Sequence, residues 1–278
     1  MQRPNLMGKN ELRIVHFLIS VGFFIGDSLW RLGQRILGSK PGSSCVVLTY
    51  HSVPDGQKEA FAAQMNTLLA LTEPIPLDRV PPLLPGRRYS AITFDDGFEN
   101  VINNAVPQLE KKGIPATVFL TVNYLGQTAG WWPASAPERL ESIADPKRWR
   151  QLPGELISIG SHSLSHPFLT AVSETEAKRE LCESRLVLED LFKRRVTVFS
   201  FPYGEFSAEL VRWCRDAGYE RVFTSLPGNA FRNMDDFVCG RVNVRLTDWA
   251  WEFRLKILGA YRWLPFAISW KRRLKKHL

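Results

Sequence analysis

The chain has 278 residues, 45% of them hydrophobic, with 19 glycines and 18 prolines. This composition provides a large core and many turns, and it fits a single α/β barrel. The scattered cysteines form no C-x-x-C pair, which argues against a zinc ribbon and predicts no disulfide framework. Cys182 and Cys214 lie within helical patterns, where we expect free, buried thiols.

The net charge of +8 resides at the C-terminal end of the chain. Residues 253–278 contain eight lysines and arginines and no acid, so residues 1–252 are formally neutral. Aromatic residues are interleaved with these bases, which is typical of an interfacial helix drawn to anionic lipid headgroups. A helix packed on the protein with a solvated basic end is the alternative. Nucleic acid is not an expected partner, because no basic patch accompanies a recognisable nucleic-acid module.

An apolar run, IVHFLISVGFFIG, occupies residues 14–26 near the N-terminus. Its 13 residues are fewer than the roughly 20 that a spanning helix needs. Arg3, Lys9 and Arg13 precede it, as in a signal peptide, but no small-residue cleavage site follows. We expect an uncleaved helix that lies on a membrane or dips into it. A helix that simply packs on the protein is the alternative.

After a Gly/Ser/Pro linker at residues 37–44, strand and helix patterns alternate along the chain. A strand at 45–53, rich in β-branched residues, is followed by a helix at 59–71 and a Pro-rich loop at 72–88. The predicted elements that follow are a strand at 91–94, a helix at 99–113 closed by Gly113, a strand at 115–122, an irregular surface insertion at 126–150, a strand at 155–163 that runs into a loop, a helix at 173–192 with Ser173 and Glu176 as a capping box, a strand at 196–201, a helix at 207–218, and strands at 219–225 and 238–244.

Strands that alternate with helices at this interval predict a parallel α/β sheet or barrel. We expect three parts: an apolar and basic N-terminal helix with its linker at residues 1–44, the folded domain at 45–247, and a basic aromatic C-terminal helix at 248–278. In such folds, functional sites lie at the C-terminal ends of the strands.

Two adjacent carboxylates, Asp95 and Asp96, follow the predicted strand AITF and precede Gly97. Neighbouring strand residues point to opposite faces, but a turn at the glycine would let both side chains converge. Two unpaired carboxylates would repel each other, so a cation is expected between them. Ordinary turn chemistry is the alternative, because Asp-Asp-Gly is also common in turns.

The chain has five histidines, and His162 and His166 share the stretch GSHSLSHPF. Pro167 biases His166 away from helical geometry, so we expect a loop after the preceding strand. The glutamate of the H-E-x-x-H helix is missing, which disfavours a metalloprotease. At the mouth of one barrel, two imidazoles and one carboxylate would form a three-ligand catalytic site for a zinc-like ion. The other aspartate would stay free as a base. Surface or otherwise satisfied histidines are the alternative.

Together these motifs resemble the polysaccharide deacetylases, the chitooligosaccharide deacetylase-like carbohydrate esterases. TFDDG at 93–97, SHSLSHP at 161–167 and FSFPYG at 199–204 occur in the order typical of that family. The likeness runs from about residue 45 to residue 245. The stretches YHSV, AGYERVFT and GRVNV add a likeness to the branch found with exopolysaccharide and envelope glycans.

The resemblance implies a distorted (β/α) barrel of about seven strands, with terminal amphipathic helices outside it. It implies that Asp96, His162 and His166 bind a divalent metal ion, zinc first, with cobalt, nickel or iron as alternatives. Asp95 would be the general base. Tyr203, next to Pro202 in the FPYG stretch, would donate its backbone N–H to the oxyanion and help to shape the sugar pocket.

The sequence departs from the commonest family pattern in two ways. Many members carry a late Leu-x-His that supplies the acid, but only His277 follows His166 here. His51 is the remaining candidate acid, with a hydrogen-bonded histidine at a strand end as the alternative. Ser200 occupies the position where many members have arginine, and Arg241 is expected to orient Asp95 instead. A charge at the surface end of a strand is the alternative for Arg241.

We therefore expect a metal-dependent hydrolase that removes N-acetyl groups from amino sugars of an envelope polysaccharide or exopolysaccharide. Trp131 and Trp132 could stack on sugar rings, or they could be buried in the barrel wall. The alternatives are a deacylase or deformylase of a lipid-linked sugar at the membrane surface, and a catalytically weak glycan-binding module. Membrane association through both termini is expected, with a cytoplasmic location as the alternative. The oligomeric state and the membrane side are left open.

Overall fold

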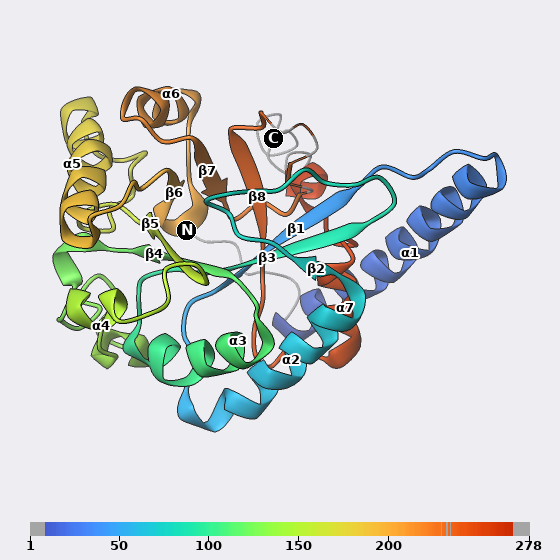
Figure 1. The fold of residues 1–278 in the computed structure, drawn as a ribbon, viewed down its shortest axis with the longest axis horizontal. Helices are drawn as coiled ribbons and strands as arrows, with labels where there is room; N and C mark the ends of the chain where they lie inside the picture. The colour runs from blue at the N-terminus through green and yellow to red at the C-terminus, as the bar shows by residue number, and fades with distance from the viewer. Residues whose placement is uncertain (1–8, 229, 232, 234, 269–278) are drawn as a thin grey trace.

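The computed structural model of the chain describes residues 9–228, 230–231, 233 and 235–268. Parallel strands form a closed barrel within this part of the chain (Figure 1). The barrel strands are β1 (Ser44–Tyr50), β3 (Arg88–Phe94), β4 (Ala116–Leu120), β5 (Ile157–Ser161), β6 (Val198–Ser200), β7 (Arg221–Thr224) and β8 (Val238–Asn243), and β2 (Glu73–Pro74) pairs with β3 outside the ring. The ring closes because β1 pairs with both β3 and β8. The expected parallel barrel is confirmed.

Helices surround the barrel, as Figure 1 shows. They are α2 (Lys58–Leu71), α3 (Val106–Lys112), α4 (Pro146–Arg150), α5 (Glu174–Phe192) and α6 (Ala208–Asp216). A π-helix at Val101–Ala105 leads into α3, and 3-10 turns lie at Asp55–Gln57, Val122–Tyr124, Pro137–Leu140 and Pro202–Gly204. The Ser173 hydroxyl accepts the Glu176 N–H at the start of α5, and Gly113, with a φ of 62°, ends α3.

Alternation along the strands separates an inner cluster from an outer one. Val47, Ala91, Phe119, Val198 and Phe223 belong to one buried cluster, while the intervening Leu48, Ile92 and Phe94 belong to the larger one that also contains helix residues. On β3, Ala91 and Thr93 therefore share a face with the next alternate residue, Asp95. This places Asp95 above the barrel interior.

Two of the local expectations were wrong. The segment 126–150 is not simply a surface insertion, because Ala129, Ile143 and Trp149 are buried in the main core. Its apolar residues are spaced without a helical or strand period, which hid their burial. Cys214 is buried as expected, but Cys182 is exposed. The buried face of α5 is formed by Leu181 and its helical neighbours, which turns Cys182 outward.

The terminal helices α1 (Lys9–Ile36) and α7 (Ala250–Ile257) lie outside the barrel and contact each other (Figure 1). With 28 residues, α1 is much longer than the 13-residue apolar run, because apolar residues continue beyond Asp27. Residues 10–36 are long and apolar enough to cross a membrane. The expected helix at 248–278 breaks early, since α7 ends at Ile257 and Gly259 adopts a φ of 77°. The bases Lys271, Arg272, Arg273, Lys275 and Lys276 lie outside the described residues.

Candidate active site

The backbone after β3 explains how two adjacent aspartates reach one place. The Asp95 N–H still donates to the Tyr50 carbonyl at 2.9 Å, so Asp95 continues the pairing of β3 with β1. Asp96 then adopts a left-handed conformation with a φ of 74°, and Gly97 follows with a φ of 87°. A Cβ atom on Gly97 would lie 2.5 Å from the end of the Leu120 side chain, and the positive φ would in any case strain a larger residue there. The turn brings both carboxylates to the mouth of the barrel.

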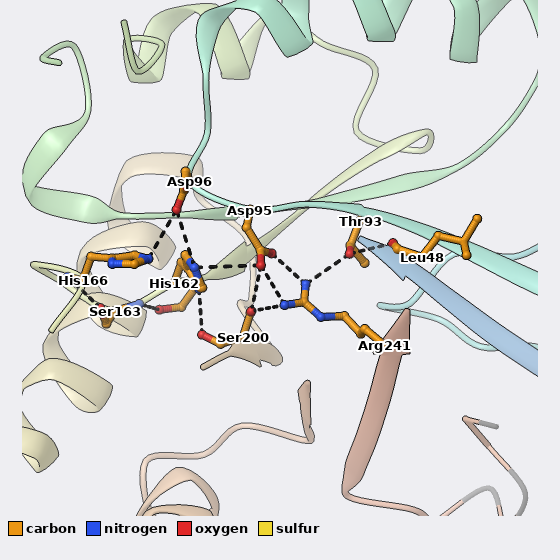
Figure 2. Close-up of polar contacts among 10 residues, drawn as sticks. Leu48, Thr93, Asp95, Asp96, His162, Ser163, His166, Ser200 and Arg241 are labelled. Carbon is orange, nitrogen blue, oxygen red and sulfur yellow. Dashed lines mark hydrogen bonds and ion pairs between the residues drawn. The ribbon is translucent and has the colours of Figure 1, made fainter. Parts of the chain in front are cut away.

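Asp95 is held by a bidentate ion pair with Arg241 of β8 (Figure 2). Nη1 and Nη2 donate to the two carboxylate oxygens, each at 2.7 Å, and Arg241 is fully buried. Nη1 also donates to Thr93 Oγ1 at 3.1 Å, inside the barrel. Burial alone would raise the pKa of Asp95, but Arg241 and then His162 outweigh it and hold this pKa below its ordinary value. Asp95 is therefore an ionised carboxylate whose orientation is fixed by Arg241. Arg241 is buried, so the alternative of a charge at the surface end of a strand is wrong.

Ser200, at the end of β6, makes room for this arrangement. Its Oγ accepts a hydrogen bond from Arg241 Nη2 at 2.7 Å and lies 3.5 Å from Asp95 Oδ2. Its backbone carbonyl accepts a hydrogen bond from His162 Nδ1 at 2.8 Å. The small side chain leaves space for a guanidinium that arrives from β8 rather than from β6. Serine in place of arginine thus coincides with an arginine supplied by another strand.

Asp96, His162 and His166 form a buried group on the other side of the mouth (Figure 2). Asp96 Oδ1 lies 3.6 Å from His162 Nε2 and 3.4 Å from His166 Nε2. Because His162 donates through Nδ1 to Ser200, its Nε2 is left to face Asp96. Among the described residues, Asp96 Oδ1 is buried without a hydrogen-bond partner. One carboxylate, two imidazoles and an unsatisfied buried oxygen fit a divalent metal ion.

The protonation states of this group follow from its burial. Burial and the charge of Asp95 raise the pKa of Asp96 well above its usual value. Burial lowers the pKa of His162 to about 4 and that of His166 to about 2. In the metal-free protein both imidazoles are therefore neutral near pH 7 and ready to act as ligands, and Asp96 is protonated more readily than a solvated carboxyl. A cation is the charge that would stabilise ionised Asp96 beside ionised Asp95.

The loop that carries both histidines is anchored by Glu180 of α5. This fully buried carboxylate accepts hydrogen bonds from the N–H groups of Leu164 at 2.7 Å and Ser165 at 3.0 Å, and from the Ser165 hydroxyl. Ser163 Oγ accepts the His166 N–H at 3.0 Å and holds the second histidine. Sequence reasoning missed Glu180 because α5 is rich in glutamates. The available signal was its place on the buried face with Ala177, Leu181, Ser184 and Leu188.

The two groups open into one cavity of about 590 Å³. Its lining includes the expected His51, Asp95, Asp96, His162, His166, Trp131, Trp132 and Tyr203, together with Phe168, Phe201, Ser225 and Asn243, which sequence reasoning missed. Among the described residues, neither Pro202 nor Arg241 lines the cavity, and both are buried. His51 lies close enough to Asp95 to contribute to the lowering of that carboxyl's pKa.

Aromatic rings form the wall of the cavity nearest His166. Trp131 stacks on the His166 ring with 4.9 Å between centroids, and Tyr203 packs edge-on against it at 4.6 Å. Phe168 stacks on Tyr203 at 3.8 Å with an interplanar angle of 8°. Trp132 Nε1 is buried without a hydrogen-bond partner in the described part of the chain. The cavity thus offers flat apolar surfaces beside polar groups.

Comparison with known proteins assigns the class. Residues 85–222 match the family model described as polysaccharide deacetylase. The Bacillus subtilis protein YxkH, whose name also refers to polysaccharide deacetylases, is 27% identical over 209 residues, covering 71% of this chain and 70% of the relative. The poly-β-1,6-N-acetyl-D-glucosamine N-deacetylase of Staphylococcus aureus is 25% identical over 174 residues, covering 61% of this chain and 58% of that enzyme.

The fold agrees with this class. The structure of IcaB from Ammonifex degensii superposes with a TM-score of 0.66 and 22% identity, covering 80% of this chain and 98% of the other. The chain therefore contains a polysaccharide deacetylase domain, and its homologues are named polysaccharide deacetylases. It is a homologue of hydrolases that act on N-acetyl amide bonds.

Proposed function

We propose that this protein is a metal-dependent hydrolase that removes N-acetyl groups from amino sugars of an envelope polysaccharide or exopolysaccharide. The observation that carries the proposal is one cavity in which Asp95, paired with buried Arg241, stands beside the group formed by Asp96, His162 and His166. The named substrate of the Staphylococcus aureus relative, an N-acetylated glucosamine polymer, supports an exopolysaccharide. The complete set of polar groups argues against a glycan-binding module without activity.

Asp96, His162 and His166 would hold the divalent ion, zinc first, with cobalt, nickel or iron as alternatives. When bound, such an ion would polarise the acetamide carbonyl and acidify the attacking water. Glu180 and Ser200 support the ligand loop from behind, through the hydrogen bonds already described. These hydrogen bonds would hold the two histidines in place before an ion binds.

Asp95 is the proposed general base that takes the proton of the attacking water. Arg241 keeps this carboxylate ionised and fixes the plane of its two oxygens. Asp95 Oδ2 lies 3.9 Å from His162 Nε2, so the base stands next to the ligand group without hydrogen bonding to it. Two adjacent carboxylates can thus have different tasks.

The remaining steps require a proton donor and a stabiliser of negative charge. His51 lines the same cavity and is the proposed acid that protonates the leaving amine. The backbone N–H of Tyr203 is the proposed donor to the tetrahedral oxyanion. Tyr203 has a left-handed backbone with a φ of 59°, a conformation that non-glycine residues rarely adopt and that is common at functional sites. Trp131, Trp132 and Phe168 offer surfaces on which sugar rings can stack.

We also propose that the protein is associated with a membrane, because α1 is long and apolar and the C-terminal end is basic. A lipid-linked sugar is the second candidate substrate, and the exposed apolar residues of α1 are the observation that favours it. We propose the boundaries that the sequence predicts, with the deacetylase domain at residues 45–247 between the two terminal segments.

Acetate release tests the proposal. The metal-stripped protein would be compared with protein reloaded with zinc, cobalt, nickel or iron on β-1,6- and β-1,4-linked N-acetylglucosamine oligomers and on N-acetylglucosaminyl lipid. We expect release that disappears with a chelator and returns with metal, and the best substrate separates polymer from lipid. Fully metallated protein that binds these glycans but releases no acetate would overturn the enzyme in favour of a binding module.

A further inference from the structure

The outer face of α1 is apolar, although it faces away from the protein. Between Leu12 and Trp30 no exposed residue of α1 is charged. The exposed apolar residues include Leu12, Ile14, Val15, Leu18, Ile19, Ile25, Leu29 and Trp30, and Leu32 and Ile36 continue the series. A helix in contact with water normally has the opposite pattern, with polar residues outside. This face is therefore suited to an apolar environment.

Two charged residues of α1, Arg13 and Asp27, are partly buried and paired with the C-terminal segment. Arg13 donates to Glu252 at 2.6 Å and to the Thr247 carbonyl at 2.9 Å. Asp27 accepts hydrogen bonds from Arg31 at 2.8 Å and from Arg262 at 2.5 Å. A helix that crossed a membrane would have to give up the contacts of Arg13 and Asp27 with the folded domain. The contacts instead favour a helix that lies in the plane of a bilayer.

Buried contacts reinforce this docking between the charged pairs. Ser20 is fully buried and accepts a hydrogen bond from Trp263 Nε1 at 2.9 Å. Phe17, Val21 and Phe24 pack against a cluster of Leu255, Ala260 and Tyr261. The inner face of α1 is thus complementary to the protein along several turns, and its outer face remains available for a partner.

A cavity of about 440 Å³ lies between the end of α1 and the start of β3. Arg31, Arg35 and Arg88 line it, together with Leu32 and Leu71. Arg31 is paired with Asp27, but among the described residues neither Arg35 nor Arg88 has an ion-pair partner. Burial, and then the neighbouring Arg31, lower the pKa of Arg88, while Asp27 acts in the opposite direction. Such guanidinium groups are suited to a phosphate.

We propose that the outer face of α1 and this arginine cavity together form a docking surface for a bilayer that contains anionic phospholipid. The helix lies in the bilayer plane, and a lipid phosphate enters the cavity between Arg35 and Arg88. Leu32 joins the two parts, since it lines the cavity and is also exposed beside the apolar face. Arg88 begins β3 and Asp95 follows its last residue, so docking leaves the catalytic mouth open. This inference rests on the proposed membrane association and specifies its surface and its lipid, and it does not depend on the proposed deacetylation.

Vesicle flotation of the full chain tests this surface with two kinds of vesicle, phosphatidylcholine alone and phosphatidylcholine with phosphatidylglycerol. We expect Arg35→Gln with Arg88→Gln to weaken binding to the anionic vesicles by roughly thirtyfold, about fivefold for each guanidinium, and to leave neutral vesicles nearly unaffected. Leu18→Gln with Leu29→Gln should weaken binding to both kinds by more than about tenfold. Matched controls are Lys111→Gln with Arg150→Gln, and Leu140→Gln with Leu186→Gln, at exposed sites elsewhere.

Three outcomes would overturn the proposal. In the first, the arginine pair and its control reduce binding to anionic vesicles equally. In the second, inorganic phosphate raises the melting temperature of the wild type but not of the arginine variant, while vesicles do not bind; the cavity then takes a free anion. In the third, the wild type is a dimer in solution, the leucine variant is a monomer, and neither form binds vesicles. The apolar face would then be a dimer interface, covered by a second copy of the chain. Circular dichroism confirms that each variant is folded.

Discussion

Two halves of the barrel mouth differ in how their carboxylates are satisfied. In the guanidinium half, Asp95 has a partner for both oxygens in buried Arg241. In the imidazole half, Asp96 has an oxygen without a hydrogen-bond partner among the described residues, next to His162 and His166. The first half is complete without a ligand, and the second is not. Adjacent residues of one strand end can therefore be prepared for different chemistry by the residues that face them.

The largest expected effect comes from breaking the guanidinium half. Arg241→Met leaves the charge of buried Asp95 unpaired, which should cost about 3–5 kcal/mol of unfolding free energy and abolish most acetate release. Chemical denaturation and an acetate assay measure the two effects. Arg241→Lys should restore part of the stability but little of the activity, because lysine cannot make the bidentate contact.

The exchange of arginine between strands sharpens the same comparison. The double variant Ser200→Arg with Arg241→Ser moves the guanidinium from β8 to β6, the position that the family resemblance indicates for arginine. We expect it to recover more stability and acetate release than Arg241→Ser alone. Equal values for the single and double variants would show that Asp95 requires its partner on β8.

His51→Gln tests whether His51, which belongs to neither half, donates the proton to the leaving amine. We expect kcat for acetate release to fall roughly 10²–10⁴-fold, the usual contribution of a general acid. Metal content and melting temperature should stay at wild-type values, because His51 is not in the ligand group. Wild-type activity in this variant would leave the leaving amine to be protonated by solvent or by another group.

Glu180→Gln weakens the hydrogen bonds that anchor the loop carrying His162 and His166. The amide retains the shape of the side chain but loses the charge that receives the loop N–H groups. We expect metal affinity, measured by competition with a chelator, to fall about 10–100-fold. Glu183→Gln is the matched control, since Glu183 lies on the exposed side of the same helix. If both variants bound metal equally tightly, the loop would not need the buried carboxylate.

The smallest expected effect is the change in stability of the metal-free protein with pH. The unfolded chain protonates its histidines near pH 6.5, whereas the folded pKa values of His162 and His166 are about 4 and about 2. The unfolded state therefore binds more protons below about pH 6.5, and stability falls as the pH decreases towards about 4. Asp96 acts in the opposite direction, because its folded pKa is raised.

Comparison of melting temperatures between pH 7 and pH 4.5 would detect this balance. The loss should be smaller in His166→Gln, which has one histidine fewer to protonate on unfolding. A loss of the same size in this variant and the wild type would mean that His166 is already protonated in the folded protein. A saturating metal ion should stabilise the wild type more at pH 7 than at pH 4.5.

Much of the barrel and the mouth could be predicted because the signals are local. β-Branched runs separated by helical patterns indicate the strands, and Gly97 after Asp96 indicates the turn. The surroundings could not be predicted in the same way. The depth of Glu180 depends on which face of α5 meets the loop, and the burial of Trp149 depends on how an aperiodic segment closes over the core. The length of α1 was underestimated because the charged Asp27 indicates the end of an apolar helix in the sequence. In the structure, Arg31 and Arg262 pair with Asp27, and the helix continues past it.

The most direct test of the division between the two halves compares Asp95→Asn with Asp96→Asn for zinc content and acetate release. Asp95→Asn should bind zinc as the wild type does and release acetate at least about 10²-fold more slowly, because only the base is lost. Asp96→Asn should lose zinc and activity together. Zinc loss in both variants, or acetate release at the wild-type rate from zinc-loaded Asp95→Asn, would contradict the assignment of one carboxylate as base and the other as ligand.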